Sequence, residues 1–206
     1  MSIYVQFGCG FDAPEGWVNY DASPTLFFER IPLWGGLYTK TEKRFPKNVI
    51  WGNIVKGLPQ QRESVTGIFC SHILEHLSLE DCRTALRNTY TYLKPGGIFR
   101  LVVPDLEYAI NQYAEDQTSQ AAQRFLETTM LGMRTRGSFL KRIVESALGN
   151  SKHQWMWDEK ALAHELKTAG FHQVRRAKFG DCMDPKFSEV EREGRFLHCL
   201  ALEALK

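Results

Sequence analysis

The chain has 206 residues, of which 43% are hydrophobic and 24% are charged. This balance is typical of a globular domain and excludes collagen-like and disordered chains. The 26 basic and 24 acidic residues leave a net charge of only +2, so charge gives no reason to expect nucleic acid or an anionic membrane as the partner.

The first third of the chain contains several short β-prone runs. They are residues 3–7, 17–20, 48–51 and 65–70. The last run has the continuous apolar character of a strand that is buried on both faces of a parallel sheet. Between residues 23 and 46, residues 26–28 fit one short helix, and the Pro, Gly and basic residues around them predict loops.

The next elements alternate between helix and strand. Ser78 with Asp81 resembles a capping box, and the apolar spacing that follows predicts a helix that ends at residues 94–97, Lys-Pro-Gly-Gly. Residues 98–103 form the most apolar strand candidate. Residues 106–149 favour two or three helices, and Asp158 is a good N-cap for a helix that stops at Gly170.

Two further strand candidates, residues 173–178 and 197–205, complete the pattern. Alternating strands and helices predict a three-layer α/β sandwich around a mostly parallel sheet. Since no repeat or change in composition marks a boundary, we expect a single domain over residues 1–206, with a helical or loop insertion on the substrate side around residues 106–157.

The cysteines and the start of the chain bear on its location. Five widely spaced cysteines without a Cys-x-x-Cys pair indicate reduced thiols. The first residues show neither a basic leader nor a long apolar stretch, and about 18 consecutive apolar residues occur nowhere. We therefore expect a cytoplasmic protein with no membrane span.

Ligands of open parallel sheets bind beyond the carboxyl ends of the strands. Five such ends are legible: Gly8-Cys9-Gly10, Asp21, Gly52-Asn53, Ser71-His72 and Pro104-Asp105. Glycines after the first strand let the backbone approach a ligand, or they simply form a tight turn. Residues 8–13 also match the dinucleotide pattern G-x-G-x-x-A, but Pro14 and Gly16 follow immediately, which disfavours a nicotinamide-binding fold.

Several ordered motifs carry a resemblance over most of the chain. They are Gly8-Cys9-Gly10 with Gly16-Trp17-Val18-Asn19-Tyr20-Asp21, then Ser71-His72-Ile73-Leu74-Glu75-His76-Leu77, then Leu93-Lys94-Pro95-Gly96-Gly97 with Val103-Pro104-Asp105-Leu106, and more weakly residues 153–158 with 169–171. In these motifs the chain resembles the class I S-adenosylmethionine-dependent methyltransferases, particularly their bacterial type 11-like branch. The resemblance implies a Rossmann-like, seven-stranded, mostly parallel sheet with an antiparallel last strand.

The resemblance also implies S-adenosyl-L-methionine as the cofactor. The implied contacts are Phe7, Gly8, Cys9, Gly10, Asp21, Asn53, Ser71 and His72, with Asp21 on the ribose and Asn53 facing the adenine. The chain departs from the family in having Asn53 where Asp is more common. It also has too short an interval between Gly10 and Asp21 for a full first helix, and it begins directly at the first strand, so we expect the helix that often covers the cofactor to be missing or supplied by other segments.

Methyl transfer requires an acceptor aligned with the donor and, for a hydroxyl acceptor, a base. The candidates near the expected cleft are His72, Asp105 and His153, with His72 first, and His76 is a further possibility. Glu75 and His76 are as well explained by a bracing role in the turn. We expect a small-molecule or glycan-type acceptor, and leave open whether oxygen, nitrogen or carbon receives the methyl group.

Other features allow functional and structural readings. Trp155 and Trp157 fit either an aromatic wall for an acceptor or the core. A basic group in the insertion fits either anion recognition or a solvated helix face: Arg134, Arg136, Lys141 and Arg142.

Two alternative functions remain. Residues 72–76 match H-x-x-E-H, a zinc metallopeptidase signature, but that motif belongs inside a helix and these residues are expected on a turn. The other alternative is a methyltransferase-like subunit that binds a partner without catalysis. We expect no bound metal, and the sequence leaves the oligomeric state undetermined.

Overall fold

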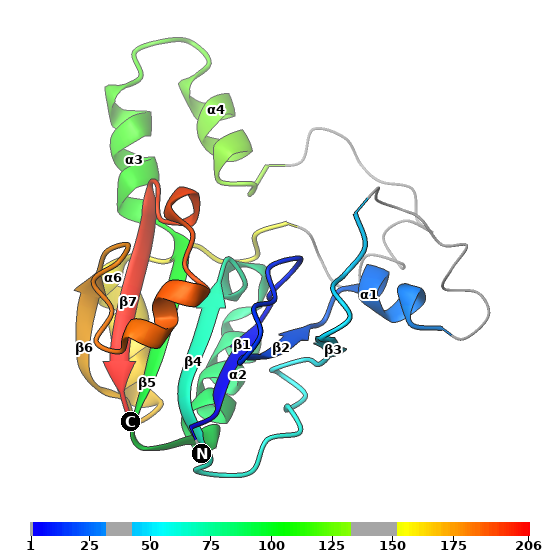
Figure 1. The fold of residues 1–206 in the computed structure, drawn as a ribbon. Helices are drawn as coiled ribbons and strands as arrows, with labels where there is room; N and C mark the ends of the chain where they lie inside the picture. The colour runs from blue at the N-terminus through cyan, green and yellow to red at the C-terminus, as the bar shows by residue number, and fades with distance from the viewer. Residues whose placement is uncertain (1, 32–42, 133–151) are drawn as a thin grey trace.

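The computed structural model of the chain describes residues 2–31, 43–132 and 152–206. In this part, one seven-stranded sheet has the order β3-β2-β1-β4-β5-β7-β6 (Figure 1). Its strands are β1 (Tyr4–Phe7), β2 (Val18–Asp21), β3 (Val49–Trp51), β4 (Val65–Ser71), β5 (Leu93–Pro104), β6 (His172–Ala177) and β7 (Cys199–Leu205). Strands β1 to β5 pair in parallel, whereas β7 is antiparallel to both β5 and β6. The predicted fold class is confirmed.

The described residues contain five α-helices, two of which, at Leu79 and Glu159, begin where the sequence places a cap. They are α1 (Pro24–Glu29), α2 (Leu79–Tyr92), α3 (Leu106–Glu115), α4 (Ala121–Thr128) and α6 (Glu159–Thr168), with short 3₁₀ helices η1 (Leu74–His76), η2 (Pro185–Glu189) and η3 (Glu193–Arg195). Ser78 Oγ accepts a hydrogen bond from the Asp81 N–H, and Asp158 Oδ1 accepts one from the Ala161 N–H. Each cap satisfies a backbone donor that the first helical turn leaves unpaired.

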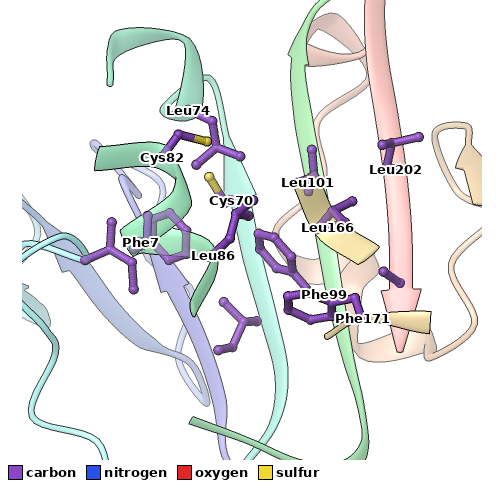
Figure 2. Close-up of a cluster of buried hydrophobic side chains, with 14 of the residues drawn as sticks. Phe7, Cys70, Leu74, Cys82, Leu86, Phe99, Leu101, Leu166, Phe171 and Leu202 are labelled. Atoms are coloured by element: carbon purple, nitrogen blue, oxygen red, sulfur yellow. The ribbon is translucent and has the colours of Figure 1, made fainter. Parts of the chain in front are cut away.

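The main core lies between the sheet and the helices α2 and α6 (Figure 2). Cys82 and Leu86 from α2 and Leu166 from α6 are fully or almost fully buried in it. They recur at helical spacing, so each helix presents one apolar stripe to the strands. Burial of one such leucine side chain contributes about 1.5–3 kcal/mol to folding.

The opposite face of the sheet is covered by short elements. Phe187 of η2 is fully buried, and its ring lies 5.6 Å from that of Trp17 and 6.5 Å from that of Phe69. The buried Arg100 of β5 donates hydrogen bonds to the carboxylates of Glu191 and Glu203 beneath this layer. Paired in this way, the charge can be buried without being left unsatisfied.

Strand β5 begins earlier than the sequence predicts. Residues 94–97 were expected to end the preceding helix as a loop, but the strand starts at Leu93, which pairs with Val65. The Gly96 N–H donates to the Lys206 carbonyl, and the Lys206 N–H donates to the Gly97 carbonyl. These bonds hold the Pro-Gly-Gly segment against the end of β7, and the register of β4 and β5 shifts there.

The segment after β5 carries α3 and α4, which project beyond the sheet (Figure 1). Helices were predicted here, and α3 and α4 confirm this for residues 106–128. Residues 133–149 and the four basic residues at 134, 136, 141 and 142 lie outside the described residues. None of the described helices combines the length and apolar character needed to cross a membrane.

Candidate active-site cavity

A cavity of about 620 Å³ opens at the carboxyl ends of the parallel strands. This volume is in the usual range for small-molecule and cofactor sites. The predicted site residues that line it are Phe7, Gly8, Asp21, Asn53, His72 and His153. The structure therefore brings together residues from the ends of β1, β2, β3 and β4 with one from the segment before α6.

The turn after β1 forms one wall of the cavity. Gly8 and Gly10 both have left-handed backbone conformations, with φ of 69° and 55°. The Gly10 N–H donates to Asp21 Oδ2 at 2.9 Å, and the Ser23 N–H donates to Asp21 Oδ1 at 2.7 Å. Each carboxylate oxygen keeps acceptor capacity, and Asp21 lines the cavity although it is only 8% exposed.

A buried amide pair explains how the chain crosses from β1 to β2 without a helix. Gln6 Nε2 donates to Asn19 Oδ1 at 2.6 Å, and Asn19 Nδ2 donates to the Pro14 carbonyl at 3.1 Å. Asn19 is fully buried. The short interval before Asp21, noted in the sequence, is thus a hydrogen-bonded loop, and the supporting role of Gln6 was not predicted.

Asn53 lines the cavity and can act there as a hydrogen-bond donor through its side-chain NH₂ group. Its Oδ1 accepts from the N–H groups of Val55 and Lys56, at 2.8 and 3.3 Å. The side-chain oxygen is therefore occupied within its own turn, and the amide offers its NH₂ group to a ligand.

The other predicted cofactor residues lie less directly at the cavity. Cys9 and Ser71 line a small pocket of about 30 Å³ beside it, together with Phe7 and Gly8. Gly10 acts through its hydrogen bond to Asp21. Burial, reinforced by the nearby Asp21, raises the pKa of the Cys9 thiol to about 12, so this thiol stays protonated at neutral pH.

His72 forms the middle of the opposite wall. It follows β4 in a left-handed conformation, with φ of 57°. Its Nε2 lies 3.0 Å from the Arg195 carbonyl, and its Nδ1 lies 3.4 Å from Glu75 Oε1. Burial alone would lower the pKa of His72, but contacts with the Cys199 thiol, Glu75 and the Arg195 carbonyl raise it to about 10.

Glu75 lies behind His72 and is completely buried. Neither of its carboxylate oxygens has a hydrogen-bond partner among the described residues. The nearest imidazole nitrogens, His72 Nδ1 and His76 Nε2, are 3.4 and 3.9 Å from Oε1, without hydrogen-bond geometry. The bracing role considered for Glu75 is carried by its backbone carbonyl, which accepts from the N–H groups of Gln154 and Trp155.

His153 reaches the same place from a distant part of the sequence. His76 Nδ1 lies 3.2 Å from the Lys152 carbonyl, and Gln154 Nε2 donates to the His76 carbonyl at 2.7 Å. The rings of His76 and His153 are consequently 5.0 Å apart. Burial lowers the pKa of His153, which keeps its ring neutral at neutral pH. The sequence nominated His153 but gave no sign that it meets Glu75 and His76.

Asp105 is not part of this cavity. Its Oδ1 accepts from the Glu107 N–H and caps α3, while its Oδ2 accepts from Arg176 at 2.8 Å. It lines a separate cavity of about 720 Å³ beside α3 and α4. Trp157 is 1% exposed and belongs to the core, whereas Trp155 is 40% exposed.

The H-x-x-E-H residues are not on an α-helix. His72 is in a bend, and only the 3₁₀ turn η1 covers Glu75 and His76. The helical scaffold of the metallopeptidase motif is therefore absent at residues 72–76, as the sequence analysis expected.

Comparison with known proteins adds the following. A family model described as "Methyltransferase domain" matches residues 9–175, and no curated protein matches the chain. A SAM-dependent methyltransferase structure from Archaeoglobus fulgidus is similar, with a TM-score of 0.55 and 16% identity over 100% of this chain and 86% of that one. A Thermotoga maritima structure, described as a SAM-dependent methyltransferase and possible histamine N-methyltransferase, is similar with a TM-score of 0.53 and 17% identity, over 100% of this chain and 83% of that one. An S-adenosylmethionine-dependent methyltransferase structure from Mesorhizobium loti is similar with a TM-score of 0.51 and 17% identity, over 99% of this chain and 90% of that one.

Proposed function

The chain belongs to the methyltransferase domain family, and from this membership we propose that it transfers a methyl group from S-adenosylmethionine to a small-molecule or glycan-type acceptor. The observation that carries the proposal is the position of Asp21. Its carboxylate lies at the end of β2 on the cavity wall, held by two backbone N–H groups. This is where a carboxylate can accept both hydroxyls of a ribose.

The cavity fits the donor in size and in the kind of groups it presents. Gly8 and Phe7 line the cavity where the methionine part would lie. Asn53 offers its NH₂ group to a ring nitrogen of the adenine, and Ile54 adds apolar surface nearby. The small pocket at Cys9 and Ser71 adjoins the methionine end.

The acceptor side is the wall formed by His72 and His153. Bound S-adenosylmethionine supplies an activated methyl group on a sulfonium, and the protein needs to orient the acceptor and keep water out. His72 and His153 both face the cavity, and the neutral ring of His153 is the one of the two that can take up a proton released by the acceptor. For Asp105 we propose a positioning role only, because its two oxygens hold α3 and Arg176.

We also propose a reducing compartment such as the cytoplasm, with no nucleic-acid partner and a single domain over residues 1–206. All five cysteines are free thiols, and reduced thiols persist in the cytosol.

The test is a calorimetric titration of the full chain with S-adenosylmethionine and S-adenosylhomocysteine. Asp21→Ala removes an ionised acceptor from two hydroxyls, and hydrogen bonds to charged groups contribute about 1.5–3 kcal/mol each, so we expect affinity to fall at least about 100-fold. Glu189→Ala is the control, because Glu189 is a surface carboxylate that pairs with Lys186 and lines neither the cavity nor the small pocket beside it. An Asp21→Ala affinity equal to that of the unchanged chain would refute the ribose assignment, and no binding to the unchanged chain would favour the non-catalytic subunit.

A further inference from the structure

The Glu75 carboxylate is the least satisfied charged group in the cavity wall. Its side chain is 1% exposed, and both of its oxygens lack hydrogen-bond partners in residues 2–31, 43–132 and 152–206. A buried charge is costly unless a counter-charge or a metal ion compensates it. His153 Nδ1 is a second buried polar atom without a partner in the same place.

Three potential ligand atoms converge at this point. One atom each from Glu75, His76 and His153 lie within 4.8 Å of one another. Ligands on opposite sides of an ion with bonds of about 2.1 Å are about 4.2 Å apart. A movement of a few tenths of an ångström would therefore bring all three atoms into one coordination sphere.

The outer nitrogen of His76 is already held by backbone. His76 Nδ1 contacts the Lys152 carbonyl, which leaves Nε2 directed at Glu75. Such outer bonds fix the tautomer and orientation of metal-binding histidines. Nδ1 of His153 is buried and has no hydrogen-bond partner among the described residues.

His72 has the same arrangement as His76. Its Nε2 is bonded to the Arg195 carbonyl, and its Nδ1 faces Glu75 Oε1 at 3.4 Å. In His72 and His76, one nitrogen meets a backbone carbonyl and the other is directed at the Glu75 carboxylate. The segment that carries His153 is fixed as well, because the Gln154 N–H donates to the Glu75 carbonyl at 2.7 Å.

We propose that Glu75, His76 and His153 bind one divalent transition-metal ion. Imidazole nitrogens with one carboxylate suit ions from Mn²⁺ to Zn²⁺ rather than Mg²⁺ or Ca²⁺, which prefer oxygen ligands. All three side chains line the cavity, so the open side of the ion faces it. The relevance of the ion to methyl transfer rests on the proposed function, but its binding does not.

The experiment measures metal binding without methyl transfer. The full chain is stripped with EDTA, dialysed and titrated by calorimetry with MnCl₂ and, separately, with ZnCl₂. We expect one ion per chain for at least one of the two salts. Glu75→Gln and His153→Ala should each weaken binding at least about 100-fold, since loss of an outer-shell partner alone costs 10–100-fold. His164→Ala is the control, because His164 is exposed on α6.

A second measurement needs no variant. The chain has six histidines, and paramagnetic Mn²⁺ should broaden the imidazole NMR signals of His76 and His153 most. It should broaden the signal of His172 least, because His172 pairs with Leu205 at the end of β7 opposite to Cys199, which contacts His72. Absence of binding to the unchanged chain, or affinity unaltered in both Glu75→Gln and His153→Ala, would overturn the proposal. Asp21→Ala separates the two proposals, because it should lose S-adenosylmethionine and keep the metal.

Discussion

The two walls of the cavity treat a buried carboxylate in opposite ways. Asp21, on the wall after β1 and β2, accepts two backbone N–H groups. Glu75, on the histidine wall, is more deeply buried and accepts none from the described residues. The Asp21 carboxylate in the first wall is thus stabilised by hydrogen bonds from the protein alone. The second wall places its charge where only nearby imidazoles, or an ion held between them, can compensate it.

The largest predicted effect is the gain in stability on metal binding, which should depend on Glu75 in one wall of the cavity and not on Asp21 in the other. At a free metal concentration of 100 times the dissociation constant, bound metal should raise the free energy of unfolding by about 2.7 kcal/mol. Glu75→Gln should abolish this increment, and Asp21→Ala should retain it, because Asp21 contacts none of the proposed ligands in the structure. Urea denaturation with and without metal measures this stabilisation in both variants. If the two variants lost it equally, Glu75 would not differ from Asp21 in its role in metal binding.

An intermediate effect is expected within the first wall. A Cβ on Gly8 would lie 2.0 Å from Ile73 Cδ1, whereas a Cβ on Gly10 would meet nothing within 4 Å. Both sites have left-handed backbone, which costs a non-glycine residue about 1–2 kcal/mol. Gly8→Ala adds overpacking of about 1–3 kcal/mol. Unfolding curves should rank Gly8→Ala as clearly less stable than Gly10→Ala, and equal stabilities would show that Ile73 gives way freely.

The smallest predicted effect concerns a third carboxylate, Glu165 of α6, which is compensated by a side chain. Arg83 donates to both of its oxygens, at 2.9 and 2.8 Å, and this lowers the pKa of Glu165. The groups facing Glu165 are Arg83, His164 and Cys82.

Because the folded chain binds this proton less tightly than the unfolded chain, the Glu165 pair stabilises the fold above the ordinary glutamate pKa. That contribution is lost as the pH falls through the lowered value. Urea midpoints measured from about pH 7 to about pH 3 should therefore fall less steeply in Arg83→Gln than in the unchanged chain. An identical pH dependence in the two proteins would rule out a contribution from this pair.

Much of the fold could be predicted from local sequence signals. Apolar runs located the strands, and Ser78 and Asp158 marked helix starts because their side chains cap the first turn. The start of β5 was misplaced because Pro-Gly-Gly is a local stop signal, which here is overridden by pairing with Val65 and by bonds to Lys206. Tertiary pairing of this kind leaves no trace in the local pattern.

The candidate site also has a part that local sequence signals predicted and a part that depends on tertiary contacts. Gly8 and Asp21 were predictable because they directly follow strands whose ends meet at one edge of the sheet. The meeting of His76 with His153 was not, because it depends on backbone bonds between segments about 76 positions apart. Backbone groups are common to all residues, so such contacts carry no sequence signature.

The position of β7 has a consequence for synthesis on the ribosome. Strand β7 is the last of the seven to be made, yet it lies between β5 and β6. Until residues 199–205 emerge, β5 has one unpaired edge, and Arg100 lacks the carboxylate of Glu203. The nascent chain therefore carries an open apolar edge and a charged side chain without its full set of partners from the synthesis of β5 until that of β7. Such intermediates are prone to aggregate and are typical clients of chaperones.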